Sequence, residues 1–190
     1  MKILIACEFS GIVREAFRLR GHDVISVDLL PSEKPGHHFT GDIFSILSLL
    51  EDDDWKPRLL VGHPPCTYLC NSGVRWLYTQ LDRWKKMEEA SAFFYRLWEL
   101  PIEKICLENP IPHKHAMLPE YTQIIQPWEH GHGETKATCL WLKGLPKLEA
   151  SNIVSGREQR IHKMPPSDTR GKDRSRTFQG IADAMAEQWG

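Results

Sequence analysis

The sequence has no apolar run near the roughly 18 residues that a membrane span needs. Its opening apolar stretch, residues 1–7, meets Glu8 too soon to be the hydrophobic region of a secretory signal. We therefore expect a cytoplasmic protein with no membrane partner. A chain of 190 residues fits one domain with a real core, and two full domains would be cramped.

Cysteine is sparse, and its spacing does not suggest disulfides. There are five cysteines, an odd number, and they lie within or beside apolar segments. Reduced thiols in a reducing compartment are the natural interpretation. The chain also lacks a Gly-x-Gly-x-x-Gly motif, so a dinucleotide cofactor is not implied.

The charge is unevenly distributed. The net charge is −1, but residues 143–176 carry nine Lys and Arg against four Asp and Glu. This segment is also rich in Pro, Gly and Ser and shows no helical or strand period. It is either a phosphate-facing surface or a solvated, loop-rich face.

Short apolar strands alternate with helical segments along most of the chain. Strands are expected at residues 2–7, 23–28, 58–62 and 103–107, with a loop or short strand at 37–42. Helices are expected at 11–20, 43–50, 80–99 and 178–189, and the third has an apolar face running from Leu81 to Trp98. A late hairpin joins 121–127 to 137–142. The pattern predicts an α/β fold with a mostly parallel sheet, covered on both sides, and an antiparallel edge hairpin.

In such a sheet, ligands bind beyond the carboxyl ends of the strands. The first strand runs into Phe9-Ser10-Gly11, where small residues let a ligand approach the backbone and the helix N-terminus. Asp28 ends the second strand and can accept hydrogen bonds from two ribose hydroxyls. Asp42 either serves an adenine amino group or caps the helix that follows it.

Pro64-Pro65-Cys66 follows the fourth strand. The two prolines hold the approach extended and remove backbone donors. A plain turn would use Gly, Asn or Asp, so this sequence favours a cysteine nucleophile, ionised by nearby donors or a helix N-terminus. Cys70 packs nearby or lines the site.

Glu108 follows the fifth strand. Burial there would raise its pKa and keep a proton available. A protonated Glu opposite a cysteine can hydrogen-bond a ring nitrogen of a pyrimidine while the thiolate adds to C6. The alternative is that Glu108-Asn109-Pro110 is a simple turn.

Taken in order, these segments resemble the C5-cytosine DNA methyltransferase family. Phe9-Ser10-Gly11 is similar to the family's cofactor turn, and Gly41-Asp42-Ile43 is similar to its adenine contact. Gly62-His63-Pro64-Pro65-Cys66 matches the nucleophile loop, and Leu107-Glu108-Asn109-Pro110 looks like the Glu-Asn-Val motif with Pro for Val. The last helix, after Phe178-Gln179-Gly180, resembles the final family motif. The likeness covers residues 2–143 and 176–190.

The resemblance implies a single Rossmann-like S-adenosylmethionine-dependent methyltransferase domain over residues 1–190. Cys66 would add to C6 of a flipped cytosine, since that atom cannot be reached within a stacked duplex. Glu108 would stabilise the protonated N3 side, and C5 would take the methyl group. The implied cofactor contacts are Phe9, Ser10, Gly11, Asp28, Asp42 and Pro64, and the implied substrate contacts include Pro65 and Asn109.

The chain departs from the family in two places. The family has a Gln-x-Arg-x-Arg motif after the hairpin turn, and here Lys136 takes that place, although a lysine lacks the two-pronged guanidinium of arginine. Alternatively, Arg157 and Arg160 supply the motif, but they come late in the sequence relative to the hairpin. Residues 144–176 stand in place of a full target-recognition domain, so DNA binding should be weak and salt-dependent. The open substrates are DNA, including single strands, or a cytosine nucleotide, with a homodimer or partner subunit as further options. The small size suggests a phage-type enzyme.

Three other interpretations remain. One is a related enzyme that uses the same cysteine on a pyrimidine or nucleotide. Another is a catalytically silent protein that binds DNA, nucleotide or cofactor. A metal site at His113 and His115 with His130 and His132 is the third, but no carboxylate or Cys spacing completes it, so no metal is expected.

Overall fold

The computed structural model describes residues 1–190. One seven-stranded sheet has the order β3-β2-β1-β4-β5-β7-β6. The strands are β1 (Lys2–Ala6), β2 (Asp23–Asp28), β3 (His38–Thr40), β4 (Leu59–Gly62), β5 (Lys104–Pro110), β6 (Gln123–Ile125) and β7 (Thr138–Lys143). The first five strands are parallel, and β7 is antiparallel to β5 and β6. This confirms the expected α/β, Rossmann-like fold with an antiparallel edge.

Central strands of a parallel sheet are buried on both faces and therefore read as continuous apolar runs. In β1 the side chains from Ile3 to Ala6 are fully buried, and Leu59 to Val61 of β4 are equally buried beside them. The apolar runs in the sequence therefore mark the middle of the sheet.

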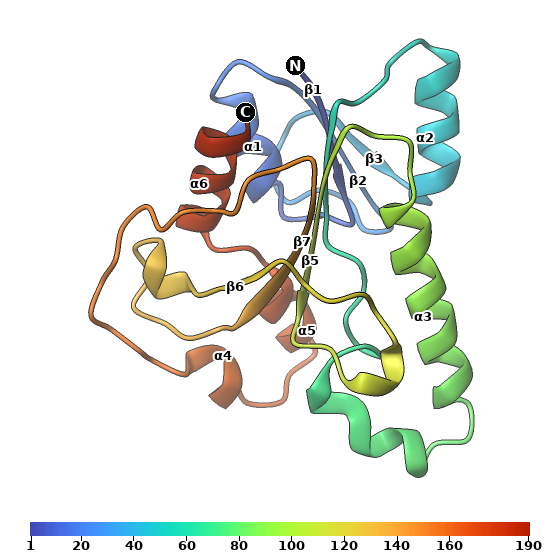
Figure 1. Cartoon of the computed structure of the whole chain (residues 1–190), viewed down its shortest axis with the longest axis vertical. Coiled ribbons are helices and arrows are strands. Elements are labelled where there is room, and N and C mark those ends of the chain that lie inside the picture. The colour runs from blue at the N-terminus through green and yellow to red at the C-terminus, as the bar shows by residue number, and fades with distance from the viewer.

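Helices cover both faces, as Figure 1 shows. The α-helices are α1 (Ile12–Arg18), α2 (Ile43–Asp52), α3 (Arg83–Trp98), α4 (Arg160–Lys163), α5 (Arg170–Ser175) and α6 (Gln179–Trp189). On one face α1 and α6 bury Phe17, Met185 and Trp189 in a core. On the other face α2 and α3 bury Leu47 and Phe94. No helix is both long enough and apolar enough to cross a membrane.

The largest departures from the sequence prediction lie around α3 and after β7. The helix expected from residue 80 begins at Arg83, and Leu81, placed on its apolar face, is fully exposed. A 3₁₀ helix, η1 (Asn71–Tyr78), precedes it. The segment without a period contains α4 and α5, which are too short for a period to be recognised. Two more short 3₁₀ helices are η2 (Lys114–Ala116) and η3 (Pro127–Glu129).

Candidate functional site

The loop that carries Cys66 is held by strand β5. The side-chain nitrogen of Asn109 donates a hydrogen bond of 2.7 Å to the carbonyl oxygen of Pro64. Asn109 is buried, and its side-chain oxygen has no hydrogen-bond partner. Beyond Cys66, the backbone nitrogens of Leu69 and Cys70 donate to its carbonyl oxygen at 3.0 and 3.1 Å, which closes a tight turn.

Two further side chains fix the same loop from outside. A ring nitrogen of His113 is 3.0 Å from the carbonyl oxygen of Tyr68. Arg83, the first residue of α3, donates to the carbonyl oxygen of Thr67 at 2.9 Å. The turn is therefore tied to both β5 and α3.

The two thiols of the loop interact. The pKa of Cys66 is raised by its hydrogen bond with Cys70, then by burial; the charge of Glu108 adds to the rise and that of Lys136 opposes it. The pKa of Cys70 is lowered to about 5, mainly by the bond from Cys66, with Ser72 contributing. Of the two thiols, Cys70 is therefore the more readily ionised in this geometry, whereas we expected Cys66 to be.

Glu108 is paired rather than isolated. Oε2 of Glu108 lies 2.8 Å from Nδ1 of His63, and both side chains are nearly buried. Burial raises the pKa of Glu108, but the hydrogen bond and charge of His63, helped by Lys136, outweigh it and lower the pKa. The expectation that burial keeps the Glu108 carboxyl protonated is therefore wrong, because His63 is buried beside it and stabilises its charged form.

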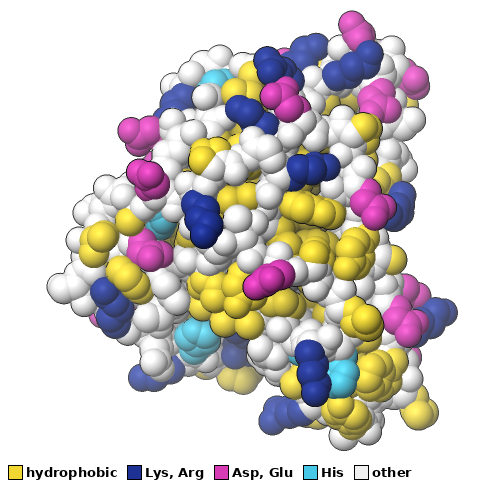
Figure 2. Space-filling model, viewed as in Figure 1, with side chains coloured by type: hydrophobic (Ala, Val, Ile, Leu, Met, Phe, Trp, Pro, Cys, Tyr) yellow, Lys and Arg dark blue, Asp and Glu magenta, His cyan; other side chains and the backbone are white.

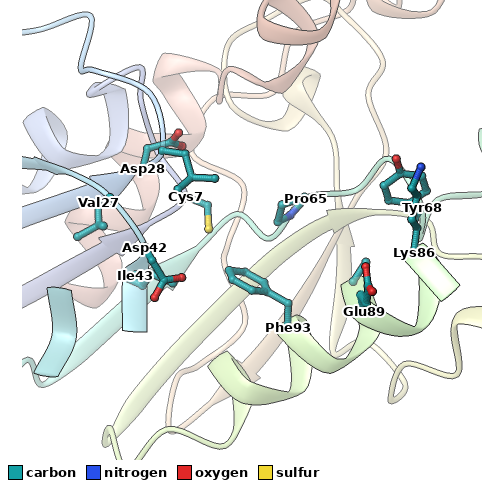
Figure 3. A pocket seen from close by; sticks show the side chains of 13 residues that line it. Cys7, Val27, Asp28, Asp42, Ile43, Pro65, Tyr68, Lys86, Glu89 and Phe93 are labelled. Atoms are coloured by element: carbon teal, nitrogen blue, oxygen red, sulfur yellow. The ribbon is translucent and has the colours of Figure 1, made fainter. Parts of the chain in front are cut away.

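A hollow of about 520 Å³ opens beyond the ends of β1 and β2. Figure 3 shows Asp28 and Asp42 on one side and Phe93 of α3 on another, with Pro65 and Tyr68 from the cysteine loop. Carboxylates beside an aromatic face suit a ribose and a purine ring.

Each carboxylate of this hollow also has a structural task. Oδ1 of Asp42 accepts hydrogen bonds of 3.0 Å from the backbone nitrogen and hydroxyl of Ser45, so Asp42 caps α2 and lines the hollow at once. Oδ1 of Asp28 accepts from the backbone nitrogen of Leu30 at 2.9 Å. Neither interaction involves the second carboxylate oxygen.

The N-terminus of α1 is not open to a ligand, contrary to our expectation. The buried carboxylate of Glu8 accepts hydrogen bonds from the backbone nitrogens of Val13 at 2.6 Å and Arg14 at 3.2 Å. Gly11 has a left-handed φ of 68°, and a Cβ there would lie 2.8 Å from the guanidinium of Arg14. Gly11 therefore shapes the turn, and Glu8 satisfies the helix end that a ligand would otherwise use.

A second hollow, about 270 Å³, adjoins the first and shares Cys7, Asp28 and Pro65 with it. Phe9, Ser10 and His63 line it, together with residues of α5 and its C-terminal side. Arg176 reaches across to Glu33, with hydrogen bonds of 2.5 and 2.9 Å, and lies over the ring of Phe9 at 5.7 Å. The C-terminal part of the basic segment, residues 143–176, therefore forms one wall of the smaller hollow.

The basic residues expected to replace the family's arginines are dispersed. Nζ of Lys136 donates to the carbonyl oxygen of Arg176 at 3.3 Å, and its charge reaches Cys66 and Glu108. Arg157 instead lies over the ring of Trp128 at 3.8 Å, and Arg160 pairs with Glu134 at 2.9 Å. These two arginines line a separate polar hollow, so only Lys136 joins the cysteine site.

Sequence reasoning missed several lining residues, above all Cys7 and His63. Cys7 has a left-handed φ of 59°, rare for a residue with a side chain, and its sulfur points into the larger hollow (Figure 3). Its pKa is raised to about 12 by burial and by the charges of Asp28 and Asp42. Its position directly after a buried strand was the available signal.

The histidine pairs have structural contacts. Nδ1 of His130 is 3.0 Å from the hydroxyl of Ser151, and Nε2 of His132 accepts from the backbone nitrogen of Gly180 at 3.0 Å. No group of three or more His, Cys, Asp or Glu side chains is arranged to hold a metal ion.

An aromatic patch, consisting of Trp76, Tyr78, Trp84 and His115, follows the cysteine loop. Tyr78 is 69% exposed, and its ring meets those of Trp84 and His115 edge to face. The guanidinium of Arg75 lies 4.5 Å from the centre of Trp76. Figure 2 shows hydrophobic, basic and His side chains together at this end of the molecule.

Comparison with known proteins shows a likeness in fold. No protein-family model matches the chain, and no curated protein matches it. A crystal structure from E. coli, described as a DNA modification methyltransferase encoded within a prophage, is similar with a TM-score of 0.50 and 15% identity, over 81% of this chain and 52% of that one. The Entamoeba histolytica methyltransferase EhMeth gives a TM-score of 0.49 and 16% identity, over 81% and 57%. The chain spans about half the length of these proteins. The likeness to the prophage-encoded protein is one of fold and agrees with the Rossmann-like sheet described above.

Proposed function

We propose that the protein transfers a methyl group from S-adenosylmethionine to C5 of cytosine in DNA, through a covalent bond between Cys66 and C6. The observation that carries this proposal is the bond from Asn109 to Pro64, which ties the cysteine loop to the strand bearing Glu108. Pro65, the neighbour of Cys66, lines both hollows, and His63, the partner of Glu108, lines the smaller one. A nucleophile and a carboxyl group at one cleft are what addition to a pyrimidine ring needs.

The cleft suits the cofactor in size and chemistry. In the larger hollow Asp28 would bind the ribose hydroxyls, and Asp42 and Phe93 would contact the adenine. The smaller hollow, with Phe9, Ser10 and Lys172, would take the amino-acid end. When bound there, S-adenosylmethionine supplies an electrophilic methyl group.

The residues of the chain then act on the base. Cys66 becomes the nucleophile when the proton that it shares with Cys70 moves to the Cys70 sulfur. As its sulfur bonds to C6, electron density moves to N3, and Glu108 passes to N3 the proton that it shares with His63. After C5 gains the methyl group, its proton passes to solvent water. The C6–S bond then breaks, the Cys66 sulfur takes its proton back from Cys70, and the proton on N3 returns to Glu108.

The surface favours nucleic acid over a free nucleotide as substrate. Exposed aromatic rings beside a cysteine loop can stack unpaired bases, and Arg75 can hold phosphate or a ring face. We propose that residues 1–190 form one methyltransferase-like domain, in which residues 144–176 close the cleft in place of a target-recognition domain. The basic hollow at Arg157 and Arg160 is a phosphate contact in this scheme.

The test uses labelled S-adenosylmethionine with single-stranded DNA, duplex DNA or dCTP, for the wild-type protein and Cys66→Ala. We expect label at cytosine C5 in DNA and none with the variant. A 5-fluorocytosine oligonucleotide should become trapped on Cys66 as an adduct visible by intact mass. If the protein does not bind the cofactor, the proposal fails, whereas binding of cofactor and DNA without turnover identifies a silent binding protein. Label on dCTP alone identifies a nucleotide-modifying enzyme.

A further inference from the structure

His63 and Glu108 meet because of the register of two strands. Strands β4 and β5 are parallel neighbours, with Gly62 opposite Leu107. The next residue on each strand is therefore His63 or Glu108, and their side chains approach to 2.8 Å. The side chains are 12% and 10% exposed, so the pair is largely shielded from water.

This contact is the one side-chain hydrogen bond that Glu108 makes. Since a carboxylate only accepts, Nδ1 of His63 carries the proton between them. Nε2 of His63 is buried and has no partner. The imidazole is therefore oriented by Glu108 alone, on the wall of the smaller hollow.

The surrounding charges favour a protonated imidazole. Burial lowers the pKa of His63, but the hydrogen bond to Glu108 and the charges of Glu108 and Glu8 raise it above its ordinary value, while Lys136 opposes them. Glu8 is occupied in capping α1, and Lys136 donates to a backbone carbonyl. Neither competes for the proton between His63 and Glu108.

We propose that His63 is a positioning residue that orients Glu108 and supplies the proton that Glu108 passes to N3 of the cytosine ring. This role rests on the proposed function. As Cys66 bonds to C6, the Nδ1 proton of His63 moves to the Glu108 carboxylate, and Glu108 passes a proton on to N3, so that His63 becomes neutral and Glu108 is again a carboxylate. When the C6–S bond breaks, that proton returns from N3 through Glu108 to Nδ1 of His63, so the pair ends the cycle unchanged.

The first test follows the His63 ring by NMR during a pH titration, without cofactor or DNA. In the wild-type protein His63 should titrate above its ordinary value of 6.5. In Glu108→Gln it should titrate below that value, since burial remains and the carboxylate is gone. A wild-type His63 that titrates at or below 6.5, or is unmoved by Glu108→Gln, overturns the inference.

The second test is the pH dependence of single-turnover methyl transfer by the wild-type protein, His63→Asn and His63→Gln, with His37→Asn as an exposed control. The wild-type rate should fall at alkaline pH as His63 loses its proton. Both His63 variants should lose that limb and be slowed at pH 6 by about a hundredfold, the lower end for proton-transfer catalysis. Identical profiles in the variants and the wild type overturn the inference alone. If the wild-type protein transfers no methyl group, the proposed function is overturned and this role of His63 with it, even if the NMR titration shows that His63 and Glu108 form an ion pair.

Discussion

The side-chain nitrogen of Asn109 lies 2.7 Å from the carbonyl oxygen of Pro64, so the strand that bears Glu108 also holds the loop that bears Cys66. The bond is fully buried. It joins the cysteine loop to the end of β5, although the two bonded residues are 45 positions apart in the sequence.

Replacing Asn109 by Ala should destabilise the protein and disorder the cysteine loop. The Pro64 carbonyl would lose its donor in a buried place, which costs about 1–3 kcal/mol. Chemical denaturation measures the change in the free energy of unfolding, and Asn71→Ala, at an exposed position, serves as control. An equal, small change in both variants would show that the bond to Pro64 contributes little.

Substitutions at two glycines with similar backbone angles can distinguish the cost of backbone strain from the cost of a side-chain clash. Gly11 and Gly21 both have a positive φ, 68° and 84°, but a Cβ at Gly21 meets nothing within 4 Å. Gly21→Ala should lose about 1–2 kcal/mol through the left-handed backbone alone. Gly11→Ala should lose more, because its Cβ also meets buried Arg14. Equal losses, measured by denaturation, would mean that Arg14 gives way without cost.

The two loop thiols should differ in reactivity. The pKa of Cys70 is lowered and that of Cys66 is raised, so Cys70 should be the more ionised thiol at pH 7. Iodoacetamide should therefore alkylate Cys70 first, as peptide mass spectrometry can show. In Cys70→Ser the remaining Cys66 loses its thiolate neighbour, so its pKa should fall. Earlier labelling of Cys66 in the wild-type protein would contradict this assignment.

The His63–Glu108 pair should stabilise the fold in a defined pH window. The raised pKa of His63 gives stability that is complete below 6.5 and is lost as the pH rises through the folded value. The lowered pKa of Glu108 gives stability that is present above 4.5 and is lost as the pH falls through its folded value. The difference in unfolding free energy between the wild type and His63→Asn should therefore be largest between pH 4.5 and 6.5 and shrink at alkaline pH. A difference that does not vary with pH would exclude ionic pairing.

The aromatic patch should contribute to nucleic-acid binding by stacking. Trp76→Ala should weaken binding of a single-stranded cytosine-containing oligonucleotide by about tenfold, since one stacked base is worth roughly 1–3 kcal/mol. Leu81→Ala is the control, because Leu81 is exposed nearby and cannot stack. Fluorescence anisotropy at fixed salt measures both. Equal affinities for the two variants would place the nucleic acid elsewhere.

The sequence by itself determined the sheet and the edge at which the candidate site residues lie. Apolar runs such as residues 2–6 can be satisfied only by burial on both faces, and the polar residues after them must then lie at the strand ends. Asp28, Asp42, Cys66 and Glu108 could all be placed at or just beyond strand ends in this way. The helix capped by Asp42 also follows from local hydrogen bonding.

Only the tertiary structure decided what these groups meet. Strand register, which a single chain segment does not encode, sets His63 against Glu108 and reverses the pKa shift expected from burial. The cap on α1 by Glu8 and the closure of Arg176 onto Glu33 join residues through turns and long-range contacts. The protonation state of a buried group depends on its neighbours as much as on its burial, and those neighbours come from distant parts of the chain.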